Sequence, residues 1–148
     1  MKVAILMGSP RDGDKMAGAS ETLERFDVPH EVHVMSAHRT PEKVAELASN
    51  ARDDGYGVII CGAGMAAHLA GAVSAHTTLP VIGVPLSGGV NGGIDALLST
   101  VQMPRGIPVA TVAVDGSANA GVLAVEILSL SNPDLVAQLK IFRDEGAR

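Results

Sequence analysis

Residues 31–48 read EVHVMSAHRTPEKVAELA, and this stretch contains a complete strand–turn–helix unit. Residues 31–35 alternate between polar and apolar side chains, which is the period of a β-strand. Thr40 is a good N-cap residue and Pro41 suits the first turn of a helix, so we expect a helix to begin at Pro41. Because strand and helix follow each other so closely, this unit predicts a chain built from alternating strands and helices.

The same alternation runs through the rest of the chain. Short apolar segments joined by helices predict a parallel sheet that is covered on both faces. We therefore expect one α/β domain over residues 1–148, with a flavodoxin-like doubly wound parallel sheet in a three-layer sandwich. The glycine-rich stretches 62–64 and 85–92 are interpreted as loops. The expected strands are 3–7, 30–35, 58–61, 81–84 and 109–114, and the expected helices are 14–26, 41–52, 66–76, 94–100, 119–129 and about 133–144.

Composition narrows the class of protein. The chain has 148 residues, of which 47% are hydrophobic and only 2% aromatic, so we expect one domain with an aliphatic interior. The net charge is −5 without a basic stripe, which argues against nucleic-acid binding as the main function. No apolar stretch approaches the roughly 20 residues of a membrane span, and the early Gly8-Ser9-Pro10 interrupts any signal-peptide pattern, so we expect a cytoplasmic protein. Cys61 is the only cysteine, and we interpret it as a buried structural thiol rather than a nucleophile.

A histidine and an arginine follow the second expected strand. This turn lies where open α/β sheets bind ligands. The guanidinium of Arg39 and the helix N-terminus beside it favour an anion, and the imidazole of His38 can transfer a proton near neutral pH. Together they indicate an enzyme that acts on a phosphorylated small molecule, with an ordinary surface histidine as the alternative.

Two further loops should reach the same edge of the sheet. In the first, Ser9 and Arg11 suit a phosphate and Asp12 suits sugar hydroxyls, although an ordinary turn with a capping aspartate fits equally well. This loop matches neither a Walker motif nor a dinucleotide fingerprint. In the third loop, GAGMAAHL at 62–69, small residues let the backbone approach a flat ligand, and His68 either lines that pocket or has a structural role. The remaining histidines, His30, His33 and His76, have no companions at metal-ligand spacing, so we expect no metal site.

Three segments taken together resemble the PurE family of purine biosynthesis. They are SAHRTP at 36–41, GAGMAAHL at 62–69 and VQMPRGIPV at 101–109, and the resemblance extends over nearly the whole chain. It implies rearrangement of N5-carboxyaminoimidazole ribonucleotide to 4-carboxy-5-aminoimidazole ribonucleotide, or carboxylation of aminoimidazole ribonucleotide with CO2. The AHRTP and AAHL forms resemble the mutase class, because the carboxylase class tends to have lysine after the catalytic histidine. A non-catalytic nucleotide-binding module remains a third alternative.

The resemblance also implies roles for individual residues. His38 is the implied general acid and base, and Asp12 the implied contact to the ribose. The family needs no ATP, metal or organic cofactor, and it implies a homo-octamer. The helix expected at about 133–144 is amphipathic, so it can pack on a neighbouring subunit. The only partner expected besides other subunits is the small-molecule ribonucleotide. The implied substrate-binding residues are Ser9, Arg11, Asp12, Ser36, Ala37, Arg39, Gly64, Ala66, His68 and Leu69.

Three positions depart from the family pattern. The first loop of the family usually reads Gly-Ser-x-Ser-Asp, whereas Pro10 and Arg11 stand at its third and fourth places here. Met65 stands where the family usually has glycine, and Ala70 where it usually has proline. Arg11 therefore either replaces a neutral phosphate donor with a charged one or points to solvent, and Met65 is expected to narrow the pocket for the base.

Overall fold

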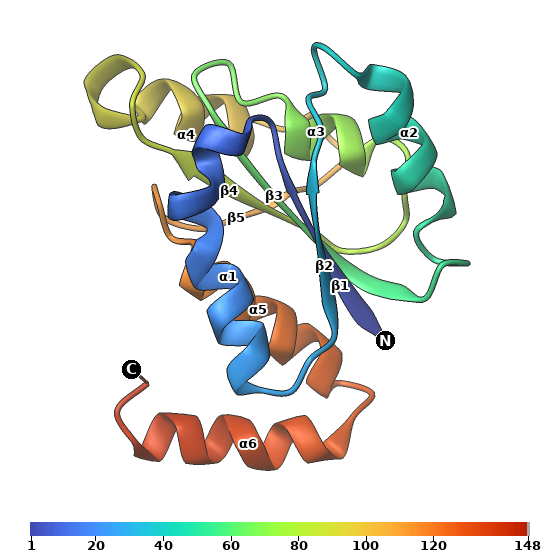
Figure 1. Ribbon diagram of the computed structural model, residues 1–148, viewed down its shortest axis with the longest axis vertical. Coiled ribbons are helices and arrows are strands. Elements are labelled where there is room, and N and C mark those ends of the chain that lie inside the picture. Colours follow the sequence, from blue (N-terminus) through green and yellow to red (C-terminus); the bar gives the residue numbers. More distant parts are fainter. Residues whose placement is uncertain (148) are drawn as a thin grey trace.

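The computed structural model describes residues 1–147, in which a parallel sheet carries helices on both faces (Figure 1). The strands are β1 (Lys2–Met7), β2 (His30–Val34), β3 (Tyr56–Gly64), β4 (Val81–Leu86) and β5 (Ala110–Thr111). The α-helices are α1 (Gly13–Arg25), α2 (Pro41–Asn50), α3 (Leu69–Ser74), α4 (Ile94–Val101), α5 (Ser117–Ser129) and α6 (Pro133–Asp144), with short 3₁₀ helices η1 (Pro10–Asp12) and η2 (Val90–Gly92). The strand order β2-β1-β3-β4-β5, with every pair parallel, is the flavodoxin-like order and confirms the predicted fold class.

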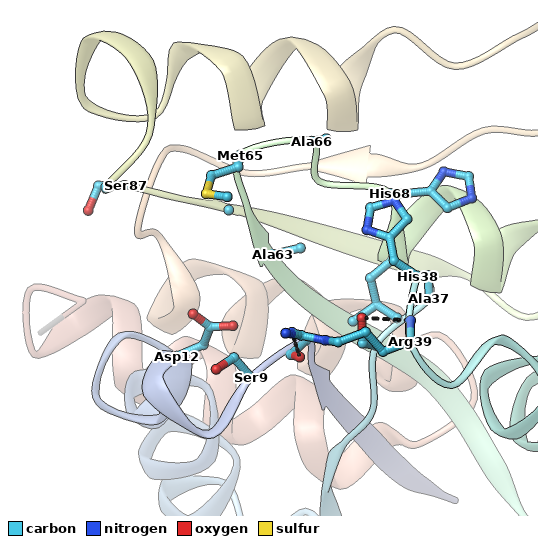
Figure 2. A pocket seen from close by; sticks show the side chains of 15 residues that line it. Ser9, Asp12, Ala37, His38, Arg39, Ala63, Met65, Ala66, His68 and Ser87 are labelled. Carbon is cyan, nitrogen blue, oxygen red and sulfur yellow. Dashed lines mark hydrogen bonds between the residues drawn. The ribbon is translucent and has the colours of Figure 1, made fainter.

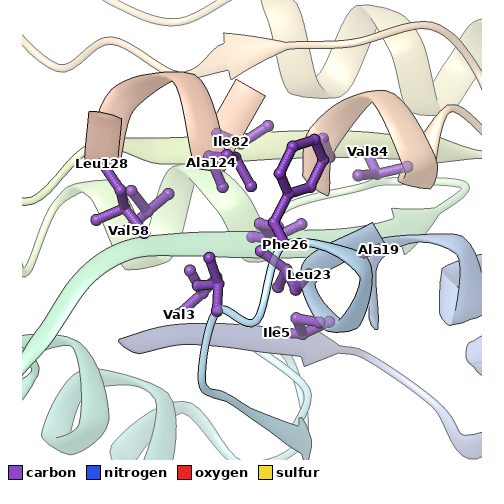
Figure 3. Close-up of a cluster of buried hydrophobic side chains, with 14 of the residues drawn as sticks. Val3, Ile5, Ala19, Leu23, Phe26, Val58, Ile82, Val84, Ala124 and Leu128 are labelled. Carbon is purple, nitrogen blue, oxygen red and sulfur yellow. The ribbon is translucent and has the colours of Figure 1, made fainter. Parts of the chain in front are cut away.

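Alternate residues of the central strands enter two separate cores. In β1, Val3 and Ile5 face α1 and α5, whereas Ala4 and Leu6 face α2 and α3. Figure 3 shows the first of these cores, in which aliphatic side chains from the sheet meet those of α1 and α5. Because the central strands are buried on both faces, their sequences are almost continuously apolar. The sheet is therefore held rigidly at the edge where its carboxyl ends carry the loops.

The last helix packs on its own chain. Leu135 and Phe142 of α6 are buried in the core that α1 and α5 form, and α6 lies across the lower end of these two helices in Figure 1. Asn132 caps α6, because its side chain accepts a hydrogen bond from the backbone N–H two residues later. Val136 and Ile141 of the same helix are exposed. Within the described part of the chain, no helix has the length and apolar character that crossing a membrane requires.

The prediction of a loop at residues 62–64 was wrong, because β3 continues to Gly64. Residues 62–64 pair with residues 84–86 of β4, which likewise extends two residues beyond the predicted strand. Gly62 serves close packing rather than a turn, since a Cβ atom there would lie 2.2 Å from Sδ of the buried Met16. The longer strands carry the site residues further along the sheet than expected.

Two other elements are shorter than predicted. The strand predicted at 109–114 is regular only at Ala110–Thr111. Beyond Thr111 the pairing with β4 is interrupted by one extra residue, which lies between two further backbone hydrogen bonds to β4. These bonds run from Val112 N to Gly83 O and from Asp115 N to Pro85 O, at 3.1 and 2.9 Å. The helix predicted at 66–76 begins only at Leu69, since a turn occupies residues 65–68.

Candidate active site

The carboxyl ends of four neighbouring strands surround a cavity of about 520 Å³ (Figure 2). This is the edge at which open α/β sheets bind ligands. The cavity receives residues from the loops after β1 and β2, from the end of β3 and the turn that follows it, and from the loop after β4. Its lining consists of Gly8, Ser9, Asp12, Ser36, Ala37, His38, Arg39, Ala63, Gly64, Met65, Ala66, His68, Leu69, Ser87 and Gly88. All predicted site residues except Arg11 therefore meet in one place.

The loop after β2 is closed by hydrogen bonds within it. Ser36 Oγ and Ser36 O accept from the backbone N–H of Arg39 at 3.3 and 3.2 Å. Thr40 stands at the predicted N-cap position of α2, but its side chain makes no capping bond, which corrects the sequence interpretation. Its hydroxyl instead accepts from Ser36 N at 3.0 Å and donates to Ser36 O at 3.1 Å. The threonine thus fixes the turn that presents His38 and Arg39.

Arg39 connects the first two loops of the site. Its Nη2 donates to Gly8 O at 3.0 Å, across from the turn after β1 (Figure 2). A guanidinium has five N–H donors, and this bond uses one. The side chain is exposed at the cavity, so Arg39 is placed beside Ser9 with donors available to an anion.

His38 and His68 lie side by side in the cavity although they come from different loops. Their rings are stacked with centroids 5.5 Å apart and planes inclined by 12° (Figure 2). His68 is exposed and lines the cavity, as one of the two sequence alternatives expected. Two imidazoles at one wall provide the groups that proton transfer to a bound ligand requires.

Arg11 is the one predicted site residue outside the cavity lining. It is exposed in η1, and its backbone N–H donates to Ser9 Oγ at 3.3 Å. The turn that begins at Pro10 thereby places the serine at the cavity and the arginine beyond it.

Met65 lines the cavity with an unusual backbone conformation. Its φ is +56°, in the left-handed region that residues with a Cβ atom seldom occupy. The side chain is 64% exposed, so little burial compensates for this conformation. Backbone strain of this kind is typical of functional sites. The sequence analysis expected Met65, a departure from the family pattern, to narrow the pocket, and the residue does line the cavity.

The sequence interpretation missed the contribution of the loop after β4. Ser87 and Gly88 line the cavity. Ser87 lies at the side opposite His38 (Figure 2). The signal that would have found them is the rule used for the other loops, since β4 is a central parallel strand whose carboxyl end meets the same edge. Gly8 and Ala63 also line the cavity, although they were not among the predicted site residues.

The remaining candidates for chemistry lie away from this cavity. Cys61 is buried within β3, and burial raises the pKa of its thiol well above the usual range, which fits a structural role. His33 contacts the Tyr56 hydroxyl at 3.3 Å, and His30 contacts Val28 O at 3.2 Å. Among residues 1–147, no three His, Cys, Asp or Glu side chains gather closely enough to hold a metal ion.

Comparison with known proteins identifies the family. A family model described as AIR carboxylase matches residues 2–148. An N5-carboxyaminoimidazole ribonucleotide mutase from Pyrococcus abyssi is 52% identical over 99% of this chain and 84% of its own length. A phosphoribosylaminoimidazole carboxylase from Schizosaccharomyces pombe is 52% identical over 96% of this chain, which corresponds to 26% of that protein. The crystal structure of Treponema denticola PurE superimposes with a TM-score of 0.89 at 29% identity, covering 98% of this chain and 90% of that one. The cavity contains residues of two of the three family segments, 36–41 and 62–69, whereas segment 101–109 does not line it. With this match over nearly its whole length and its flavodoxin-like sheet, this chain belongs to the AIR carboxylase family.

Proposed function

We propose that this protein is an N5-carboxyaminoimidazole ribonucleotide mutase of de novo purine biosynthesis. One observation carries the proposal: His38 and Arg39, adjacent in one loop, face a small-residue turn at a single cavity. Relatives named as this mutase match nearly the whole chain at about half identity or slightly more, including those of Pyrococcus abyssi and Aquifex aeolicus.

His38 is proposed to transfer the protons of the rearrangement. The bond between the exocyclic nitrogen and the carboxylate carbon breaks, the electron pair stays on nitrogen, and nitrogen takes up a proton. The ring carbon then attacks the released CO2, and the proton on that carbon is removed. One proton is given and one is taken, so a single imidazole can serve as acid and then as base. His68, stacked on His38, provides a parallel face beside the reacting ring.

The other lining residues are proposed to hold the substrate. Arg39, Ser9 and Ser36 lie together where the loops after β1 and β2 meet, and they suit the 5′-phosphate. Asp12, which lines the cavity, is proposed to accept hydrogen bonds from the ribose hydroxyls. The remaining implied contacts, Ala37, Gly64, Ala66 and Leu69, have small or apolar side chains that suit the flat imidazole ring and CO2. These groups require no ATP, metal or organic cofactor.

Recapture of CO2 requires that the site exclude bulk water. His38, Met65 and His68 are exposed in the isolated chain, so a cover is needed. Apolar residues of η2 and α4 form a face close in sequence to the loop that lines the cavity, and 45–66% of each side chain is exposed: Val90, Ile94, Leu98 and Val101. Such a face favours association of subunits. We propose a cytoplasmic homo-octamer, as the family resemblance implies, and light scattering coupled to size exclusion measures the subunit number.

A direct isomerisation assay tests the proposed activity. Purified protein is given the N5-carboxylated ribonucleotide in buffer without added bicarbonate, and formation of the C4-carboxylated isomer is followed. The carboxylase alternative is favoured by the relatives that bear that name, such as the Schizosaccharomyces pombe protein. It predicts turnover of aminoimidazole ribonucleotide that rises with bicarbonate concentration. Efficient carboxylation without isomerisation would replace the proposed activity with this alternative, and binding without any turnover would indicate a non-catalytic module.

A further inference from the structure

The loop that follows β4 forms a wall of the cavity but has little conformational restriction of its own. Four of its residues between positions 88 and 93 are glycines, and three of these have positive φ. Glycine loses more backbone freedom on ordering than any other residue. A well-defined wall at Ser87 and Gly88 therefore needs contacts from elsewhere in the fold.

Two charged residues from different elements hold Ser87. Lys15 Nζ, in α1, donates to Ser87 O at 2.6 Å and to Ser87 Oγ at 2.8 Å. On the other side, the backbone N–H of Ser87 donates to Asp115 Oδ1 at 2.9 Å. Asp115 is itself fixed, since its own N–H donates to Pro85 O at 2.9 Å. Every polar group of Ser87 is thus engaged by a contact that ties the loop to α1 or to the segment before α5.

The position of Lys15 has no explanation in the stability of its helix. It is the third residue of α1, where the helix dipole disfavours a cation. The contacts with Ser87 give the ammonium its partners instead, and Nζ would lie only 3.7 Å from a Cβ atom at Gly88. Burial alone would raise the pKa of Asp115, but the hydrogen bonds from Ser87 and the charge of Lys15 lower it overall. Lys15 and Asp115 therefore interact favourably on either side of Ser87, through their opposite charges and through their hydrogen bonds with this residue.

We propose that Lys15 is a positioning residue for the reaction, which together with Asp115 holds Ser87 so that the loop after β4 forms the wall of the cavity opposite His38. Lys15 itself is not among the lining residues and acts through Ser87. The expected change in KM rests on the proposed function, whereas the expected ordering of the loop after β4 does not. Because the wall lies away from His38, loosening it should weaken substrate binding more than proton transfer.

Lys15→Met and its matched control test the proposal. Lys43 is also the third residue of a helix, follows an acidic residue as Lys15 does, and is exposed on α2. In Lys15→Met, loss of two hydrogen bonds from a charged donor should raise amide exchange of residues 87–93 by about tenfold to a hundredfold. If the loop is correctly placed for about a tenth of the time, KM rises about tenfold while kcat changes less than threefold. Lys43→Met should leave both measurements unchanged, and Lys15→Arg, which keeps the charge and donors, should restore most of the KM.

The outcomes separate this proposal from the proposed function. Unchanged exchange at residues 87–93 overturns the positioning role whether or not the enzyme isomerises its substrate. Exchange that rises uniformly along the chain, or a lower kcat at constant KM, indicates general destabilisation and also overturns it. If Lys15→Met does not fold, Asp115→Asn provides the second measurement. This variant keeps an acceptor for Ser87 N but removes the charge. Amide exchange of residues 87–93 and KM should therefore both rise, by smaller factors than those expected for Lys15→Met. A wild-type protein without turnover contradicts the proposed function and leaves the exchange result to decide the role of Lys15.

Discussion

Replacing Met65 by glycine should stabilise the protein. The φ of +56° costs a residue with a Cβ atom about 1–2 kcal/mol. Glycine removes that cost but widens the unfolded ensemble, which offsets about 0.4–1 kcal/mol of the gain. Since the Met65 side chain is 64% exposed, little burial is lost. The net gain is about 0.5–1 kcal/mol, or an increase in Tm of about 1–4 °C for a chain of this size.

Thermal unfolding of two variants separates the backbone contribution from that of the side chain. Met65→Ala keeps the Cβ atom in the left-handed region and removes the thioether, so its Tm should not exceed that of the wild type. Asp27 has a φ of +51° at the end of α1, outside the cavity lining, and Asp27→Gly is the control for strain relief alone. Its gain should be smaller, because aspartate tolerates this region better than methionine. A Tm for Met65→Gly at or below that of Met65→Ala would refute the assignment of strain.

The same variant should bind substrate less well. Met65 lines the cavity, and partial burial of its side chain against a bound ring would contribute about 1 kcal/mol, or about fivefold in affinity. We therefore expect the KM of Met65→Gly to rise although its Tm rises, whereas Asp27→Gly should leave KM unchanged. Equal KM values for Met65→Gly and the wild type would show that the side chain makes no contact with the substrate, and the strain would then lack a role in binding.

Four further predictions concern charged and titratable groups. His38→Asn should lower kcat by about two to four powers of ten while substrate still binds, and near-normal turnover would exclude His38 as the proton-transfer group. Arg39→Lys keeps the charge but loses the guanidinium fork, so affinity should fall more for the phosphorylated substrate than for its nucleoside in a competition assay; equal losses contradict a phosphate contact. Arg11→Ser should leave affinity and its salt dependence unchanged, because Arg11 is exposed outside the cavity lining, and a flatter salt dependence would show that it reaches the phosphate. Hydrogen bonds from Lys2 and a tyrosine hydroxyl lower the pKa of Glu31 below 4.5. The folding stability that these bonds contribute is therefore present above that pH and is lost as the pH falls through the folded-state pKa. In acid unfolding, Glu31→Gln should lack this loss of stability.

The order of elements and the edge that carries the site could both be predicted from sequence. Apolar runs alternating with helices restrict the chain to a parallel sheet, and its geometry brings the loops after neighbouring strands together. This is why the loops that carry His38 and His68, 30 residues apart, were expected at one edge of the sheet, and the two rings are found stacked there. A single sequence does not show whether a glycine serves a turn or close packing. Gly62 matched a turn signal, but it allows Met16 to pack against a strand.

The boundaries that failed depend on contacts between distant residues. Thr40 was expected to cap α2 because of its place in the sequence, but its hydroxyl bonds Ser36 within the loop instead. The strand predicted at 109–114 loses its regular pairing where the chain gains one residue relative to β4, just before Asp115 turns toward Ser87. Local propensity has no access to either partner, so tertiary contacts decide both cases.

Arg11 and Lys15 show how this limitation affects a functional site. Both are cations close to the Gly8–Asp12 turn, and sequence reasoning favoured Arg11 because it occupies a motif position next to Ser9 and Asp12. In the fold, η1 leaves Arg11 exposed, whereas one further turn of helix aims Lys15 at Ser87, 72 residues away. Distance along the chain from a motif is thus a poor measure of distance from a ligand once a helix begins, since each residue rotates the side-chain direction by about 100°. The helix dipole disfavours a cation in the first turn, but this position does not by itself indicate a partner outside the helix, since Lys43 occupies the same place in α2 and is exposed. Only the fold distinguishes Lys15 from Lys43.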